Sequence, residues 1–185
     1  VLLALGFGIA LWVAASFAIG RSILVTSMLE HEREDGLALA RRMHGLVDAE
    51  LVRLDRTSRD WSAWDETWAF ARGEAEDYVE RNVYDGVLAN LKLNLMAVVG
   101  ADDTLRLARG AAAVSGEPRP LLPALLRHLA PGGAWLAAHE RDRPLAGLVP
   151  GPDGPLAFVA HPIHRSSPTP GEQSAGTQVF GRVLG

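Results

Sequence analysis

The 185-residue sequence contains no cysteine. This absence excludes a disulfide framework, thiolate metal sites and a cysteine nucleophile, but it fits an oxidising compartment and the cytosol equally well. Proline and glycine number only 11 and 19 and show no triplet period, which excludes a collagen-like chain. A large basic excess is also missing, since the formal net charge is −4, and this argues against a nucleic-acid partner. With 48% hydrophobic residues, the chain is long enough for one domain with its own core.

Charge is absent from one segment altogether. The 18 Lys and Arg and the 22 Asp and Glu residues all follow position 20, and residues 1–20 read VLLALGFGIALWVAASFAIG. In a helix that rises about 1.5 Å per residue, about 20 apolar residues span the roughly 30 Å hydrocarbon core of a bilayer. We therefore expect a transmembrane signal anchor at residues 1–22 and an extracytoplasmic domain at residues 23–185. Two alternatives stay open: a secretory signal peptide cleaved at Ser16-Phe17-Ala18, and a buried core helix.

The segment that follows is typical of a long helix. No proline occurs between residues 27 and 59, and glycine occurs there only at positions 36 and 45. Apolar residues recur with spacings of three and four, which predicts an amphipathic or coiled-coil-like stripe. Its members are Leu37, Ala40, His44, Val47, Leu51, Leu54 and Ser58. Two uses of the stripe stay open, and both can hold along different stretches: packing on the domain's own core, and a lengthwise homodimer contact that passes movement to the membrane helix.

The densest chemical signal is aromatic. Residues 60–70 read DWSAWDETWAF, which places three of the five tryptophans within eight positions. At about 100° per residue, Trp61, Trp64, Asp65 and Trp68 share an arc of about 100° on one helical face. Because indoles prefer a partner for each N–H, a carboxylate among them is either a structural acceptor or a ligand-binding group. The alternative is an aromatic core stripe, with Asp60 as an N-cap.

The rest of the chain mixes short helices with strands bounded by turn residues. A short turn and helix is expected at residues 73–84 and a helix at 120–130. Residues 90–99 are expected to lead into a strand, and further strands are expected at 104–109, 144–149, 155–163 and 177–184. The turns at residues 100–103 and 151–154 predict two hairpins. A long helix followed by antiparallel strands indicates an α+β domain of PAS-like or Cache-like kind, with a central antiparallel sheet.

Several of these segments together resemble a known family. The run DWSAWDETWAF, then Tyr78, Asn82 and the run LKLNLMAVVGADDTLRLAR, is similar to the CHASE sensory domains, specifically to their fourth class. The likeness covers residues 50–110 and extends more weakly to Phe158–Ile163 and to residues 176–184. The glycine usual in the hairpin of that class is replaced by Thr104 or displaced.

The resemblance implies an extracytoplasmic input domain between two membrane helices of a signalling protein. The output of such proteins is typically a diguanylate cyclase, a cyclic-di-GMP phosphodiesterase or a histidine kinase, and the motifs of none of them occur in these residues. We expect this chain to be the sensor portion alone, ending before a second membrane helix.

Catalytic constellations are scarce. His161 and His164 fall on opposite sides of the expected strand, and nothing completes a metal site with them. There is no nucleophile elbow and no phosphate-binding glycine loop. Asp102 and Asp103 lie in a turn, where aspartate is common for backbone reasons. We therefore expect no enzyme activity, no cofactor and no metal.

The sequence favours the ligand-sensing input domain of a membrane-bound signal transduction protein. We expect it in the bacterial cytoplasmic membrane, with residues after about 22 facing the periplasm or exterior. Its expected partners are an unidentified small molecule, the membrane and a second copy bound through the N-terminal helix. The ligand-binding candidates are Trp61, Trp64, Asp65, Trp68, Tyr78, Asn82 and Asn94, with Arg106 and Arg109 as further candidates for an anionic ligand. A membrane-anchored structural or protein-interaction domain, and an anchored hydrolase, stay open as alternatives.

Overall fold

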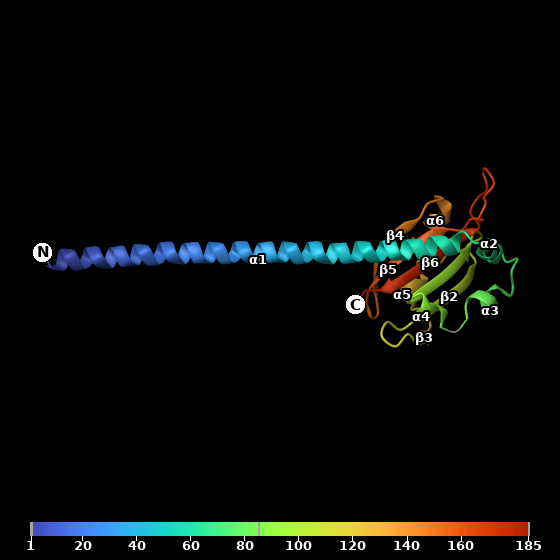
Figure 1. Ribbon diagram of the computed structural model, residues 1–185, viewed down its shortest axis with the longest axis horizontal. Coiled ribbons are helices and arrows are strands. Elements are labelled where there is room, and N and C mark those ends of the chain that lie inside the picture. Colours follow the sequence, from blue (N-terminus) through green and yellow to red (C-terminus); the bar gives the residue numbers. More distant parts are fainter. Residues whose placement is uncertain (1, 85, 185) are drawn as a thin grey trace. The chain divides into compact units, whose positions relative to one another are not determined.

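Within the residues that the structure describes, a six-stranded antiparallel sheet organises the C-terminal part of the chain (Figure 1). In this computed structural model the backbone is described for residues 2–84 and 86–184, and side chains for residues 12, 16, 17, 21, 36–84 and 86–184. The spatial order of the strands is β3-β2-β1-β6-β5-β4. Their bounds are β1 (Leu95–Gly100), β2 (Leu105–Ala111), β3 (Pro118–Arg119), β4 (Leu145–Gly151), β5 (Gly154–Pro162) and β6 (Gly176–Val183).

Helices precede the sheet and interrupt its strands. They are α1 (Leu2–Ser62), α2 (Asp65–Ala71), α3 (Tyr78–Asn82), α4 (Val87–Asn90), α5 (Pro123–Leu126) and α6 (Ala137–Glu140). The chain divides into two compact units, Val1–Leu46 and Val47–Gly185, and α1 contributes residues to both. The second unit contains the sheet, the last turns of α1 and all of the shorter helices.

The last strand occupies the centre of the sheet. β6 lies between β1 and β5, so that Phe180 has both Met96 and Val159 as register partners. All six residues of β1 and the first six of β6 are buried. Strands become buried in this way when other elements cover both faces of a sheet. The hairpins β1–β2 and β4–β5 are therefore joined within the sheet through β6.

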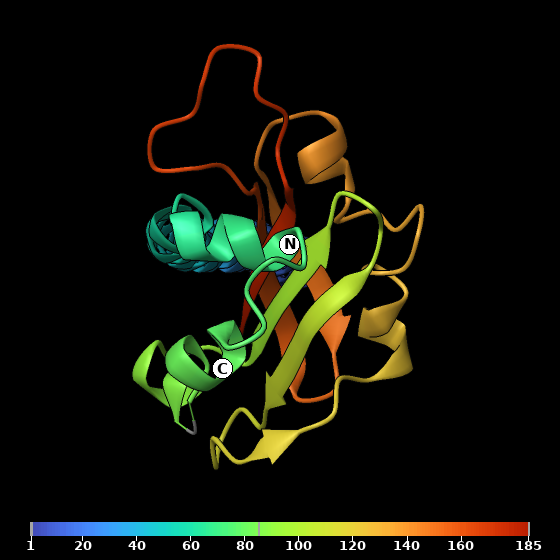
Figure 2. The same cartoon turned by 90° about the vertical axis from the view of Figure 1, so that its right-hand side faces the viewer.

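Two apolar cores lie on the two faces of the sheet (Figure 2). Successive side chains of a strand point to opposite faces, so Met96 and Val98 enter one core while Leu95, Ala97 and Val99 enter the other. The last turns of α1, with α2, α3 and α4, cover the first core through Leu54, Phe70, Tyr78 and Val87. The segment that carries α5 and α6 covers the second core through Leu125, Leu129, Trp135 and Ala138.

The expected α+β class with a central antiparallel sheet is confirmed. The two expected hairpins are β1–β2 and β4–β5, and the expected final strand is β6. The helix expected at residues 120–130 is shorter than predicted. It begins at Pro123, whose ring suits a first helical position, and the amides of His128 and Leu129 bond three residues back in tighter turns.

The stripe on the long helix packs on the domain's own core where it meets the sheet. Leu54 and Ser58 are buried, and Leu51 packs against the first core. This confirms the first of the two expected uses for these residues. Leu37 and Ala40, farther up the helix, are exposed in the single chain, so a homodimer contact through them stays a prediction.

Of the membrane span expected at residues 1–22, the described backbone from residue 2 onward is helical, but most of the side chains lie outside the described residues. When only the described residues are considered, no helix is both long enough and apolar enough to cross a bilayer. The expected boundary between residues 22 and 23 stays a prediction.

Candidate functional site

The tryptophan segment is not one continuous helix, which corrects the single helical face expected from the sequence. α1 ends at Ser62 and α2 begins at Asp65, and Trp64 between them has extended backbone, with φ −84° and ψ 136°. The amide of Trp64 donates to the carbonyl of Trp61, three residues back, in a tightened last turn. The carboxylates of Asp65 and Glu66 favour the new helix start electrostatically. Trp61 therefore lies on α1, Trp64 lies between the helices, and Asp65 and Trp68 lie on α2, so one helical period does not relate the four side chains.

Trp61 and Trp64 form a stacked pair at the end of α1. Their ring centroids are 4.8 Å apart, and the Trp61 ring meets Phe180 of β6 edge-on at 5.9 Å. Trp61 packs against the first core, whereas Trp64 is 40% exposed. Trp61 thus fixes the end of α1 on the centre of the sheet, in the manner of the core-stripe alternative.

Asp65 holds the long loop between β5 and β6. We call this loop, residues 163–175, the strap. The Asp65 carboxylate accepts hydrogen bonds from the amide of Ser166 at 2.9 Å and from its hydroxyl at 3.1 Å. A second tie lies beside it, because the amide of His164 donates to the carbonyl of Ser62 at 3.0 Å. The start of the strap is therefore attached to the end of α1 and to the start of α2.

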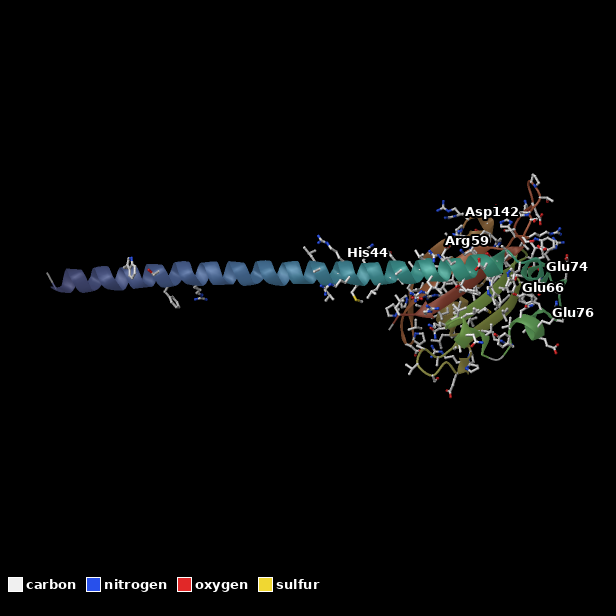
Figure 3. The ribbon with its side chains drawn as sticks, viewed as in Figure 1. His44, Arg59, Glu66, Glu74, Glu76 and Asp142 are labelled. Carbon is white, nitrogen blue, oxygen red and sulfur yellow. The ribbon has the colours of Figure 1, made fainter. Side chains whose placement is uncertain are left out.

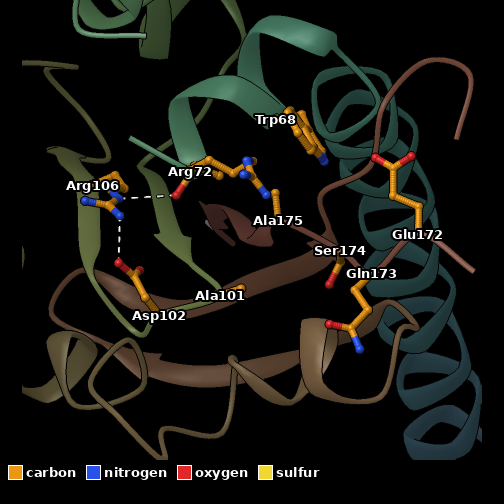
Figure 4. Close-up of a pocket in the computed structure, with 10 residues that line it drawn as sticks. Trp68, Arg72, Ala101, Asp102, Arg106, Glu172, Gln173, Ser174 and Ala175 are labelled. Atoms are coloured by element: carbon orange, nitrogen blue, oxygen red, sulfur yellow. Dashed lines mark hydrogen bonds and ion pairs between the residues drawn. The ribbon is translucent and has the colours of Figure 1, made fainter. Parts of the chain in front are cut away.

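Trp68 borders a hollow of about 450 Å³, which we call the Trp68 hollow (Figure 4). Its walls come from the end of α2, the turn between β1 and β2, strand β2 and the strap. Its polar lining residues are Arg72, Asp102, Arg106, Glu172, Gln173 and Ser174. The aromatic cluster thus contributes one wall residue to a hollow that segments far apart in the sequence complete.

Two guanidinium groups lie over the Trp68 ring. The carbon of the Arg72 guanidinium is 4.6 Å from the ring centroid, and that of Arg165 is 4.0 Å from it. Both distances are in the range of favourable cation–π contacts. The indole Nε1 of Trp68 is shielded from solvent and has no hydrogen-bond partner among the described residues. This wall of the hollow is therefore aromatic, cationic and rich in donors.

Arg106 fastens the opposite wall to α2. Its Nε donates to the carbonyl of Ala71 at 3.2 Å, and its Nη2 pairs with the Asp102 carboxylate at 2.7 Å (Figure 4). The amide of Thr104 also donates to Asp102, and this hydrogen bond, with the nearby Arg106 charge, lowers the pKa of that carboxyl. The close approach of Arg106, Asp102 and Ala71 requires glycine at position 100. A Cβ there would lie 2.5 Å from Asp102 Oδ1 and 2.6 Å from the Ala71 carbonyl oxygen.

A comparison with known proteins identifies the family. The model of the CHASE4 domain matches residues 46–185. The chain belongs to the CHASE4 family. This confirms the resemblance seen in the sequence, and the matched range begins one residue before the second compact unit.

The CHASE4 domain described here is also similar to part of a signalling enzyme. It is 27% identical over 157 residues to the methanogenesis regulatory histidine kinase FilI of Methanothrix harundinacea. The aligned region covers 83% of this chain and 16% of that kinase, so the chain spans only a small part of that relative's length. The family and this relative together support a sensory input domain.

Tyr78 of the CHASE4 domain is a core residue. Its ring stacks on Phe70 with centroids 4.4 Å apart, and its hydroxyl shares a hydrogen bond with Thr67 Oγ1 at 2.9 Å. Burial raises the pKa of the phenol, against the opposing effect of the Thr67 hydrogen bond. Tyr78 therefore joins α3 to α2 from inside the first core.

The two predicted asparagines also make internal ties. Asn82 donates to the carboxylate of Glu66 at 3.0 Å, which joins the end of α3 to α2. Asn94 accepts a hydrogen bond from the amide of Val183 at 2.9 Å, just before β1 begins. Neither asparagine lines the Trp68 hollow, and their predicted ligand role has no further support from these contacts.

Sequence reasoning missed Arg72 and the strap residues of the hollow. Arg72 follows Trp68 by four positions, the spacing that brings side chains together on a helix, so the signal was present. No local pattern in the sequence indicated that residues 172–175 lie beside α2. Arg109, one of the weaker candidates, lies instead at a separate hollow of about 540 Å³ between α4 and β2.

The histidines at residues 161 and 164 have different partners. His161 pairs with Asp55. His164 Nε2 lies 2.6 Å from the Oδ1 of Asp142, which follows α6 and is labelled in Figure 3. Within the described part of the chain, no group of three His, Asp or Glu residues is arranged to hold a metal ion.

Polar contacts join the last turns of α1 to the sheet. Glu50 pairs with Arg182 of β6, and Asp55 pairs with His161 of β5. Two further buried polar groups, the hydroxyl of Ser58 on α1 and the side-chain amide of Gln178 on β6, have no hydrogen-bond partner among the described residues. The helix that leads out of the domain is thus held partly by polar groups and not by apolar packing alone.

Proposed function

We propose that this chain is the ligand-sensing input domain of a membrane-bound signal transduction protein, with the Trp68 hollow as its small-molecule site. The observation that carries the proposal is the position of the strap. It forms one wall of the hollow through Ser174 and Ala175, and it is also bonded to Ser62 and Asp65 at the junction of α1 and α2. A ligand that displaces the strap therefore acts on the end of α1.

The signal leaves the domain through α1. A ligand shifts a conformational equilibrium only if it binds one state better than the other. In this domain the two states differ in how the last turns of α1 lie on the sheet. The ties between Asp55 and His161 and between Glu50 and Arg182 are the contacts that such a shift rearranges.

The proposal places residues 1–22 in the cytoplasmic membrane and the domain outside it. The support is the charge-free sequence of residues 1–20, which is long enough to span a bilayer as a helix. A homodimer through α1 belongs to the same proposal. It is supported by exposed apolar side chains on that helix, namely Leu37, Leu39, Met43 and Leu46.

The output belongs to a region that this chain does not contain. The similarity to a histidine kinase favours a histidine kinase output, as in a two-component system, and the cyclic-di-GMP enzymes that the family resemblance implies are the alternative. A PAS-like or Cache-like form of the domain is likewise part of the proposal. It is supported by the central position of β6 between the two hairpins.

Thermal unfolding of the detergent-solubilised chain in the presence of a broad panel of small metabolites tests the proposal. A ligand of the Trp68 hollow raises the Tm of the wild type and loses its effect in Trp68→Ala. Trp64→Ala is the matched control, since Trp64 neighbours the same helix but does not line the hollow. Circular dichroism verifies that both variants are folded. If no compound acts in a Trp68-dependent manner, the alternative of a structural or protein-interaction domain replaces the proposal.

A further inference from the structure

The inference concerns which chemical class of ligand the Trp68 hollow takes, and it rests on the proposed function. The α2 wall of the hollow has hydrogen-bond donors that the protein itself does not use. Arg72 donates through Nε to Glu74 at 2.7 Å, and its remaining N–H groups have no acceptor among the described residues. A guanidinium carries five N–H donors and no acceptor, so most of the binding capacity of Arg72 is unused inside the protein.

The carboxylates of the hollow, by contrast, are already engaged. Asp102 accepts from the amide of Thr104 at 3.1 Å and pairs with Arg106. Glu172 accepts through Oε2 from the amide and the hydroxyl of Thr169 at 3.0 and 2.9 Å. Its Oε1 lies 3.3 Å from Arg165 Nε as an ion pair and has no hydrogen-bond partner among the described residues. Hydrogen bonds from the neighbouring amides also lower the pKa of both carboxyls, so both stay ionised and paired at neutral pH.

Trp68 adds an unpaired donor. Its Nε1 is shielded from solvent and has no partner in the described chain. A buried N–H without an acceptor is unfavourable, and a ligand removes that penalty only if its acceptor atom displaces a group that now shields Nε1. Figure 4 shows Trp68 and Arg72 on the α2 side of the hollow, with Ser174 and Gln173 of the strap across from them.

Arg106 presents its guanidinium in a fixed position. Gly73 lies against it, since a Cβ on this glycine would be 3.5 Å from the central guanidinium carbon. The hydrogen bond to the Ala71 carbonyl and the pair with Asp102 hold the group from two further sides. A group held in place before binding loses little entropy when the ligand arrives.

We propose that the Trp68 hollow binds a small organic anion, with Arg72 and Arg106 as the groups that recognise its carboxylate and Trp68 as an aromatic wall. Planar guanidinium groups match the two oxygens of a carboxylate, which favours a carboxylic acid over a spherical ion. The volume of about 450 Å³ lies in the range of small-molecule sites. The neighbouring hollow, which shares strap residues with it, is lined by Glu140 and Asp142 and by no arginine, so the anion is expected on the Trp68 side.

The test measures Tm of the whole detergent-solubilised chain at fixed ionic strength with acetate, lactate, succinate and benzoate. Succinamide and putrescine serve as the uncharged and cationic counterparts of succinate. At least one of the carboxylates is expected to raise Tm in a saturable manner, and its amide or amine counterpart is not. In Arg72→Gln its apparent affinity falls about tenfold or more, as the loss of a charge-assisted hydrogen bond requires. Arg109→Gln is the matched control, because Arg109 lies on the same strand as Arg106 but outside this hollow.

Two results overturn the anion assignment. One is no saturable effect from any of the four carboxylates, and the other is equal affinity in Arg72→Gln and the wild type. The wider metabolite panel separates this failure from a failure of the proposed function. If a neutral or cationic compound raises the Tm of the wild type but not that of Trp68→Ala, the Trp68 hollow is still a ligand site, but for another class of ligand. If no compound has an effect on Tm that depends on Trp68, the Trp68 hollow is not a ligand site, and the proposed function fails as well.

Discussion

The imidazole Nε2 of His161, near the end of β5, lies 2.9 Å from the Asp55 carboxylate on α1. His161 is only 5% exposed, and Asp55 also pairs with Arg59 one turn along the helix, at 2.6 Å. Burial lowers the pKa of His161, and the hydrogen bond and charge of Asp55 oppose this effect only in part. A neutral imidazole therefore bridges the outgoing helix and the sheet at neutral pH.

This pair makes stability depend on pH. Because the pKa of His161 is lower in the folded chain than in the unfolded chain, the unfolded chain binds more protons as pH falls below about 6.5. The free energy of unfolding is therefore expected to fall on acidification from pH 7 through that range. Urea titrations of the wild type and His161→Gln at several pH values measure the effect, and the slope in the variant is expected to be smaller. Equal slopes in the two proteins would contradict the assignment.

Gln178→Met is expected to stabilise the domain. Gln178 is 1% exposed, and neither its amide nitrogen nor its carbonyl oxygen has a partner among the described residues. An unpaired buried amide costs about 1–3 kcal/mol, so an apolar side chain of similar size is expected to raise the free energy of unfolding by that order. Gln173→Met, on the exposed strap, is the control, with an expected change within about 0.5 kcal/mol. A clear loss of stability in Gln178→Met would show that the amide is satisfied in solution.

Asp65→Ala is expected to release the strap while leaving the fold intact. The carboxylate makes its hydrogen bonds with Ser166, and both groups are at the surface. The free energy of unfolding is expected to change by less than about 1 kcal/mol. Limited proteolysis within residues 166–173 is expected to become several-fold faster. Asp60→Ala, an exposed aspartate near the end of α1, is the matched substitution, and the idea fails if both variants are cut at the wild-type rate.

Gly100→Ala is expected to detach α2 from the turn between β1 and β2. The added Cβ meets the backbone carbonyl of Ala71 and the carboxylate of Asp102, and the former cannot move without shifting α2. The cost is expected at about 1–3 kcal/mol, typical of overpacking. Gly45→Ala provides the contrast, because Gly45 lies in the long helix with open space around it and is expected to be neutral or stabilising. Both values come from thermal or chemical unfolding, and a Gly100→Ala protein as stable as the wild type would rule out the close packing.

Much of the fold was predictable because its signals are local. Turn residues at 100–103 and 151–154 specified the two hairpins, and the absence of proline from 27 to 59 specified the long helix. The break at Trp64 was not predictable, since no glycine or proline marks it. The stack of Trp61 on Trp64 and its contact with Phe180 hold the chain there, and both depend on the sheet.

The sequence by itself determined the class of the domain, its hairpins, the burial of the Leu54 stripe and the family, because periodicity and turn chemistry act over a few residues. The candidate site was decided by the tertiary structure. Ser166 reaches Asp65 across 101 positions, and Arg106 reaches the end of α2 across 35. These contacts exist because β6 pairs between the two hairpins and so brings the strap beside α2. Pairing between distant strands leaves no local pattern in the sequence, and only the folded sheet reveals it.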